Sequence, residues 1–109
     1  MDKFISRANI DHYLSLLNDA SLAPKIRATV TKLLVEEMDK LHGDLEQLEF
    51  AEQRAAHGRD RLNHLRSRLD LAPEQHRAEA ERLVANAEAI QHLLEGFCHQ
   101  LRNRVNNRP

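Results

Sequence analysis

Two reversals, each written Leu-Ala-Pro, constrain the fold of this chain more than any other feature of its sequence. They are Ser21-Leu22-Ala23-Pro24 and Asp70-Leu71-Ala72-Pro73. In each, a capping residue stands three positions before a proline. Proline is tolerated in the first turn of a helix, because its missing N–H would have no partner there. A helix-like run precedes each reversal and a longer one follows, so the sequence predicts three helical segments.

Composition favours long helices over a thick core built on sheets. Of 109 residues, 30% are charged and only 4% aromatic, and Gly and Pro number three each. A chain of this length forms a single domain, residues 1–109. It holds no apolar run of about 18 residues and no secretion leader, so we expect a cytoplasmic protein that spans no membrane. The single cysteine, Cys98, excludes an intrachain disulfide.

Apolar periodicity places the helices at about residues 6–18, 22–69 and 72–104, with a frayed tail at 105–109. A period of seven runs through the central segment, at Leu34, Leu41, Leu48, Ala55, Leu62 and Leu69. Six positions in phase favour one uninterrupted helix of roughly 70 Å. Gly43 and Gly58 each weaken a helix by about 1 kcal/mol relative to Ala, so a break at His57-Gly58 is the alternative.

Antiparallel packing follows when the apolar seams of these helices are matched about the two reversals. The third segment alternates three-four, as a coiled-coil seam does. The second reversal pairs Leu41 with Leu101, Leu48 with Leu94, Ala55 with Ala87, Leu62 with Ala80, and Leu45 with Phe97. The first reversal pairs Leu17 with Ile26, Tyr13 with Val30, Ile10 with Leu33, and Ile5 with Met38. The predicted fold is therefore all-α: a short helix and a third long helix, both packed against a long central helix in antiparallel coiled-coil fashion.

Apolar residues outside the seams indicate association between chains. They are Leu16, Val35, Phe50, Val84, Leu93 and Cys98. Two antiparallel helices bury one stripe each, and helix pairs commonly cover further apolar surface by joining into four-helix bundles. We therefore predict a two-fold homodimer that buries these residues or presents them to a partner. The alternative is that they are scattered exposed apolar residues, which are ordinary on protein surfaces.

Enzymatic chemistry is not expected, and we assign no catalytic residue, cofactor or metal. The sequence has no Gly-rich phosphate loop, nucleophile elbow or metal-spaced Cys/His set. His92 and His99 share a helix face with Glu88 and Glu95, a combination that could ligate zinc or iron. The same spacing suits ordinary Glu–His pairs one turn apart on an exposed face.

Phosphotransfer is an alternative function. His42 and His57 are each followed by glycine, and phosphotransfer histidines also lie on helical bundles with a small residue nearby. That family has Lys-Gly three to four residues after the histidine, and neither histidine here has it. The alternative is therefore a two-component phosphotransfer or phosphatase accessory that uses His42 or His57.

Weak nucleic-acid binding is a further alternative. Residues 54–68 carry Arg54, Arg59, Arg61, Arg66 and Arg68. Phosphate contacts from such residues supply most non-specific affinity for nucleic acids. The net charge of −1 and the acidic residues expected alongside favour salt bridges between helices instead.

The first part of the chain carries a family resemblance. Residues 7–13 (Arg-Ala-Asn-Ile-Asp-His-Tyr), Arg27-Ala28 and Leu33-Leu34-Val35-Glu36-Glu37 follow one another within about 40 residues. This part resembles short uncharacterised bacterial helical-hairpin proteins, which look like a small helix, a reversal and a Leu-Leu-x-Glu-Glu helix. The resemblance implies no activity. The sequence therefore predicts a non-catalytic helical module that binds itself and a protein partner through a charged helical face or a groove between helices.

Overall fold

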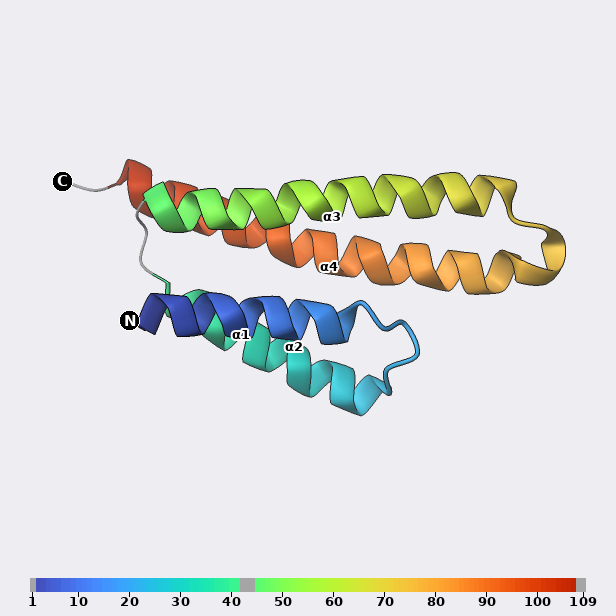
Figure 1. Ribbon diagram of the computed structural model, residues 1–109, viewed down its shortest axis with the longest axis horizontal. Helices are drawn as coiled ribbons and strands as arrows, with labels where there is room; N and C mark the ends of the chain where they lie inside the picture. Colours follow the sequence, from blue (N-terminus) through green and yellow to red (C-terminus); the bar gives the residue numbers. More distant parts are fainter. Residues whose placement is uncertain (1, 42–44, 108–109) are drawn as a thin grey trace.

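Two antiparallel helical hairpins lie along each other in the computed structural model, which describes residues 2–41 and 45–107 (Figure 1). Within these residues the helices are α1 (Asp2–Leu17), α2 (Pro24–Asp39), α3 (Leu45–Leu71) and α4 (Glu74–Asn106). The described residues contain no strand, which confirms the all-α prediction. None of their helices is long and apolar enough to cross a membrane.

Both Leu-Ala-Pro stretches mark reversals, as predicted, but their capping residues do not cap. The N-cap residues of α2 and α4 are Ala23 and Pro73, and neither makes a side-chain capping bond. Ser21 instead donates from its backbone N and its Oγ to Asp19 Oδ1, at 2.9 and 2.6 Å. Asp70 lies inside α3, which continues to Leu71. Each reversal therefore lies at its proline, and the helix that follows begins without a polar side chain that caps it.

The predicted long central helix is wrong. α2 ends at Asp39, where the N–H groups of Lys40 and Leu41 turn back to bond the carbonyls of Glu37 and Met38 at 3.2 Å. A helix over residues 22–69 would be roughly 70 Å long, whereas the longest dimension of the molecule is 55 Å. The break lets α1–α2 fold back along α3–α4 and bury apolar surface that a straight rod would expose.

The alternative break at His57-Gly58 is also wrong, because α3 runs through Gly58 without interruption. Gly43, the other glycine predicted to weaken the helix, lies outside the described residues. The first helix spans residues 2–17 rather than 6–18, and the last spans 74–106 rather than 72–104.

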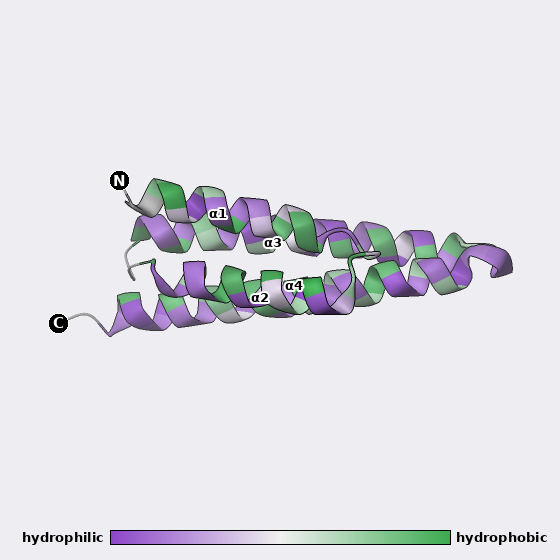
Figure 2. Ribbon diagram, turned by 90° about the horizontal axis from the view of Figure 1, so that it is seen from below, coloured by the Kyte–Doolittle hydropathy of each residue, from purple (hydrophilic) through white to green (hydrophobic). Residues whose placement is uncertain are grey.

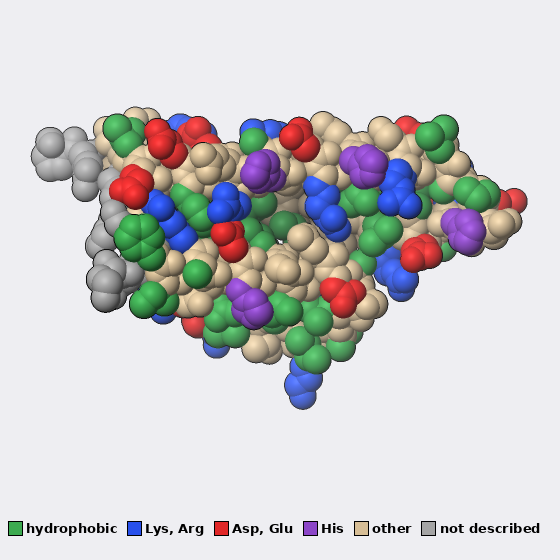
Figure 3. Space-filling view, in the orientation of Figure 1, with side chains coloured by type: hydrophobic (Ala, Val, Ile, Leu, Met, Phe, Trp, Pro, Cys, Tyr) green, Lys and Arg blue, Asp and Glu red, His purple; other side chains and the backbone are tan. Residues whose placement is uncertain are grey.

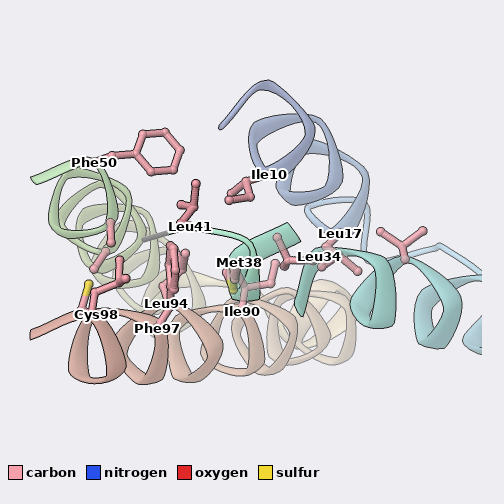
Figure 4. Close-up of a cluster of buried hydrophobic side chains, with 14 residues drawn as sticks. Ile10, Leu17, Leu34, Met38, Leu41, Phe50, Ile90, Leu94, Phe97 and Cys98 are labelled. Carbon is pink, nitrogen blue, oxygen red and sulfur yellow. The ribbon is translucent and has the colours of Figure 1, made fainter. Parts of the chain in front are cut away.

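The end of the molecule that holds both termini is four helices thick. Its core takes Ile10 and Leu17 from α1 and Leu34 from α2 (Figure 4). Leu101 of α4 belongs to the same core, and all four residues are at most 1% exposed. α1 lies beside α3 and α2 beside α4 (Figure 2). We call this part the four-helix half. It is a bundle closed within one chain.

The rest of the α3–α4 hairpin projects past the short hairpin as a pair of helices, which we call the arm (residues 62–87). Asn86 marks its base. Its Nδ2 donates to the carbonyl of Leu17 at 2.9 Å, and its Oδ1 accepts from Arg27, which also donates to the carbonyl of Asp19. From Glu74 to this base, α4 runs about 20 Å with only α3 beside it.

The pairing of α3 with α4 differs from the predicted register by about one turn. Ala55 does not face Ala87: its carbonyl accepts from Gln91 Nε2 at 2.9 Å. Ala87 packs with Leu62 in the arm instead. Leu45, predicted to meet Phe97, is 67% exposed. The register slips because the reversal lies between Leu71 and Glu74 rather than at Leu71 itself.

The members of two predicted pairs belong to the same core in the four-helix half. Leu41 and Leu101 are both buried in its core, and Arg104 Nη1 donates to the carbonyl of Leu41 at 3.2 Å. Leu48 is half-buried against the same core as Leu94. These pairs lie where all four helices meet, so a shift along one hairpin still leaves them in the same core.

The short hairpin is rotated relative to its predicted pairing. Ile5, Ile26 and Leu33 were each expected to face a partner across the first reversal, and all three are exposed. The buried place belongs to Leu34, one residue after Leu33. Successive residues of a helix point about 100° apart around its axis. The prediction that Leu33 is buried therefore placed the wrong face of α2 inward.

Candidate binding surfaces

An apolar groove follows the outer part of the arm. It is a hollow of about 540 Å³ across the second reversal, and its apolar wall comes from Leu65, Leu71, Ala72, Pro73, Ala80 and Leu83. Leu71 is 85% exposed, the most exposed large apolar residue described. Only one side of each arm helix is buried against the other, because no third helix reaches this far. The groove is apolar surface that the chain leaves uncovered.

Opposite charges stand on the two rims of this groove. Arg68 contributes from α3 and Glu79 from α4, with His76 beside the reversal. Neither Arg68 nor Glu79 makes an ion pair within the described part of the chain. Arg66, which points elsewhere, is paired with Glu88 at 3.0 Å. The rims therefore carry one charge of each sign available to another molecule.

Sequence reasoning missed this groove, although its signal was present. Leu71, Ala72 and Pro73 were interpreted only as a reversal, but three apolar residues at the tip of a hairpin also have nothing beyond them to be buried against. Reversals lie on the surface and are ordinarily polar. An apolar reversal at an exposed tip is therefore a signal of a binding surface.

The surface predicted for dimerisation does not exist as one surface. Phe50 and Cys98 are buried in the four-helix half, and Val84 is buried between the helices of the arm. Phe50 and Cys98 belong to the same buried cluster as residues of the short hairpin, and Val84 belongs to the cluster between α3 and α4.

The remaining residues of that predicted surface lie on or near the short hairpin. Leu93 is half-buried and lines a shallow groove between α2 and α4 together with Val35. Leu16 and Val35 are exposed to 37% and 38%. They are separate exposed positions rather than parts of one patch with Phe50, Val84 and Cys98.

A second hollow, the seam pocket, lies where α1 meets α3 and α4. Its volume is about 300 Å³, and its floor is apolar, with Leu14, Ile90 and Leu94 among its lining residues. Figure 3 shows the recess at the seam between the hairpins, with basic side chains on either side. Arg54 and Arg61 of α3 both line it. No sequence motif predicted this pocket, because its walls come from three separate helices.

Of the two phosphotransfer candidates, His57 is exposed and lines the seam pocket. His42 lies outside the described residues. Gly58 after His57 has a structural reason: a Cβ there would collide with Gln91 Oε1 and stand 3.2 Å from Leu94 Cδ1. The glycine is required for close helix packing and does not by itself open access to the histidine.

Ion pairs account for most of the arginine-rich segment. Arg54 makes a bidentate bond to Asp11 at 2.6 and 2.8 Å and lies 4.4 Å from the centre of the Phe50 ring. Arg59 is 2.7 Å from Glu95. These arginines join helices, as salt bridges flanking a seam do, which leaves fewer charges for phosphate contacts.

The face with two histidines and two glutamates shows the same pattern. Glu88 and Glu95 pair with arginines of α3, and His99 Nε2 lies 3.3 Å from the Asn103 amide. Residues 2–41 and 45–107 contain no group of three or more His, Cys, Asp or Glu residues placed to hold a metal ion.

Several titratable groups of the four-helix half have shifted pKa values. The Lys40 ammonium, 3.0 Å from Glu37 Oε1, holds the pKa of Glu37 below its ordinary value, and Ser6 adds a hydrogen bond. Hydrogen bonds from Gln91 and then Arg59 lower the pKa of Glu95. Burial raises the pKa of the Cys98 thiol, so this cysteine is a poor nucleophile.

A scan against protein-family models and searches of curated proteins and of solved structures find no match.

Proposed function

We propose that this chain is a non-catalytic helical interaction module that dimerises by pairing the arm grooves of two copies. The observation that carries the proposal is the uncovered apolar groove of the arm, next to a half of the same molecule in which the same two helices share a core with α1 and α2. In that half, α3 and α4 are stable because another hairpin lies on them. A second arm would supply the same cover to the first.

The charges on the groove favour a second copy as the occupant. In a two-fold arrangement each contact occurs twice, with the roles of the chains exchanged. Arg68 of one chain can then lie against Glu79 of the partner subunit, and Glu79 of the first against Arg68 of the partner subunit. A surface with one charge of each sign on opposite rims is complementary to itself.

The length of the arm sets the expected strength of the dimer. About 20 Å of two helices offers a patch at the small end of specific interfaces, which bury roughly 800 Å² per partner in stable complexes. We therefore expect a reversible dimer with a dissociation constant on the order of 10 μM. The free, buried thiol of Cys98 suits a reducing compartment, and we propose a cytoplasmic location. A further protein partner would bind the dimer.

The test is analytical ultracentrifugation of the full chain from 1 to about 500 μM. We expect a monomer–dimer equilibrium that Leu71→Glu weakens at least ten-fold, because it places a charge in the interface and disturbs no buried contact. Leu45→Glu, also at an exposed leucine but at the other end of α3, is the matched control and should leave the equilibrium unchanged.

Charge reversal tests the two-fold geometry. Arg68→Glu and Glu79→Arg should each weaken the dimer, and the double variant should restore it, since the pair is only exchanged. A chain that stays monomeric at 500 μM, or a dimer that Leu71→Glu leaves intact, would overturn the proposal.

A phosphotransfer accessory is the second candidate, because His57 is exposed beside Arg54 and Arg61, which could meet a phosphoryl group. Incubation with a phosphorylated receiver domain tests it. Loss of receiver phosphate that depends on His57, and is absent in His57→Ala, would support this role. No transfer, or equal transfer by the variant, would reject it.

A further inference from the structure

We propose that the seam pocket binds a small amphipathic carboxylate, with Arg61 holding the carboxylate and the floor between α1 and α4 holding the aliphatic part. The proposal is independent of dimerisation, because the pocket lies on the four-helix half and the groove lies at the tip of the arm.

The floor of the pocket is built to bury an apolar group. Leu14 comes from α1, and Ala87, Ile90 and Leu94 come from successive turns of α4. Gly58 of α3 also lines the pocket, at a point where α3 packs closely against Gln91 and Leu94 of α4. A volume of about 300 Å³ is at the lower end of ligand pockets and suits an aliphatic chain of about six to ten carbons.

Arg61 differs from the other arginines along this part of α3. Arg54, Arg59 and Arg66 each bind a carboxylate of α1 or α4. Arg61 is half-buried at the pocket and has no carboxylate partner among the described residues. A planar guanidinium held at an apolar pocket is suited to a bidentate bond with a ligand carboxylate.

Two buried polar atoms at the pocket lack partners. Three side-chain atoms in the described part of the chain are buried without a hydrogen bond, and two of them, Arg61 Nε and Gln91 Oε1, belong to pocket residues. Gln91 is 6% exposed, and its Nε2 is engaged with the Ala55 carbonyl and with Glu95. Buried polar groups are normally satisfied, so the Arg61 Nε–H is a donor that a ligand carboxylate would complete. Gln91 Oε1 is an acceptor and needs a donor such as a bound water, because an ionised carboxylate only accepts hydrogen bonds.

The charge of the pocket fits a monoanion. Asp11 and Arg54 neutralise each other through their bidentate bond, which leaves Arg61 as the fixed charge of the lining residues. Ser15, Asn18 and His57 supply further hydrogen-bonding groups around it. One uncompensated cation matches one carboxylate and is less suited to a phosphate, which carries more charge and usually meets several donors.

The test is isothermal titration calorimetry of the full chain carrying Leu71→Glu, so that dimerisation does not contribute. The probes are sodium octanoate, octanamide and sodium acetate. A ligand of about ten heavy atoms is expected to bind with a dissociation constant on the order of 10⁻⁴ M. Octanamide lacks the charge and acetate lacks the chain, so each should bind at least ten-fold more weakly than octanoate.

Two variants locate the site. Arg61→Gln should weaken octanoate at least ten-fold, whereas Arg66→Gln, on the same helix but paired with Glu88 outside the pocket, should leave it unchanged. Ser15→Phe should block the mouth of the pocket from an exposed position on α1 without touching the core. Circular dichroism confirms that each variant remains helical.

Three results would overturn the proposal. They are equal binding of octanamide and octanoate, an Arg61→Gln variant within two-fold of the parent, and amide NMR shifts that map to the arm groove instead of Leu14, Gly58 and Leu94. Because the titration uses the Leu71→Glu chain, a negative result leaves the proposed dimer untouched, and a monomeric parent chain leaves this binding test unaffected.

Discussion

The four-helix half and the arm are built from the same two helices, α3 and α4, but only the first is covered by α1 and α2. In the covered part, Ile10, Leu34 and Leu101 reach 0% exposure. In the arm, the best buried residues, Ala87 and Leu62, keep 5% and 6%. Two helices bury one stripe each, and a third layer is needed before a side chain is enclosed on all sides. We therefore expect the four-helix half to contribute most of the stability and the arm to provide the surface available for binding.

The largest expected effect is from Leu94→Asp, which places an unpaired charge in the covered core. We expect the chain to lose its cooperative thermal transition, followed by circular dichroism at 222 nm. Leu45→Asp is the control: Leu45 is exposed in the first turn of α3, where a carboxylate is favourable, so its melting temperature should not fall. A cooperative transition in Leu94→Asp would show that the two halves are less different than the burial indicates.

Truncating one leucine in each half measures the contrast directly. Leu34→Ala should lower the free energy of unfolding by about 3–5 kcal/mol, because an enclosed cavity cannot collapse. Leu65→Ala should lower it by about 2 kcal/mol, since the arm can relax and admit water at the site. Urea titrations at low micromolar concentration, where the arm is not covered by a partner, give both values. Equal losses would contradict the comparison.

A pair of glycines probes the edge of the covered half. Gly58→Ala should destabilise the chain by about 1–2 kcal/mol, because the new Cβ meets Gln91 and Leu94 and this crowding outweighs the gain in helix propensity. Gly96→Ala is the matched control in α4. Nothing lies within 4 Å of its Cβ position, so it should stabilise by up to about 1 kcal/mol. Thermal melts check both; a more stable Gly58→Ala would mean that Gln91 moves aside freely.

The smallest expected effect is a loss of stability at acidic pH. The pKa of Glu37 is lowered in the folded state, so its carboxylate adds stability above the pKa of the unfolded chain, and this is lost as pH falls through the folded value. Below about pH 4.3 the parent should therefore lose part of its extra stability relative to the Glu37→Gln variant. Urea midpoints between about pH 7 and 3 measure this, with Glu81→Gln, at an exposed position of the arm that does not line the groove, as the control variant. Parallel profiles for parent and Glu37→Gln would refute the coupling to Lys40.

A repeating pattern misled the sequence analysis in the central segment. The period of seven passes from Leu34 through Leu41 to Leu48 in phase, yet α2 ends at Asp39 and α3 begins at Leu45. Leu34 and Leu41 are buried and Leu48 is half-buried, all against one core. Periodicity reports which residues are buried, and a chain that breaks and folds back can bury them as well as a straight helix can. The number of helices was therefore beyond what the pattern could settle.

The candidate sites were less predictable than the helices. The paired charges of Arg54 and Arg59 agree with the interpretation as salt bridges between helices, because charges flanking a seam can be seen in one helix at a time. The seam pocket needs Leu14, Gly58 and Ile90 to meet from three helices, and no local pattern specifies that meeting. The arm groove depends on where the short hairpin stops, which the contact between Leu17 and Asn86 decides.

By itself the sequence determined that the chain is helical and where it reverses, since helix propensity, apolar spacing and proline act over a few residues. Only the tertiary structure decided that the chain breaks after Asp39 and that Phe50 and Cys98 are buried within its own four-helix half. The spacing of apolar residues within one helix indicates which face of that helix is apolar. Which surface meets that face depends on contacts between residues far apart in the chain, and those form only when the whole chain closes.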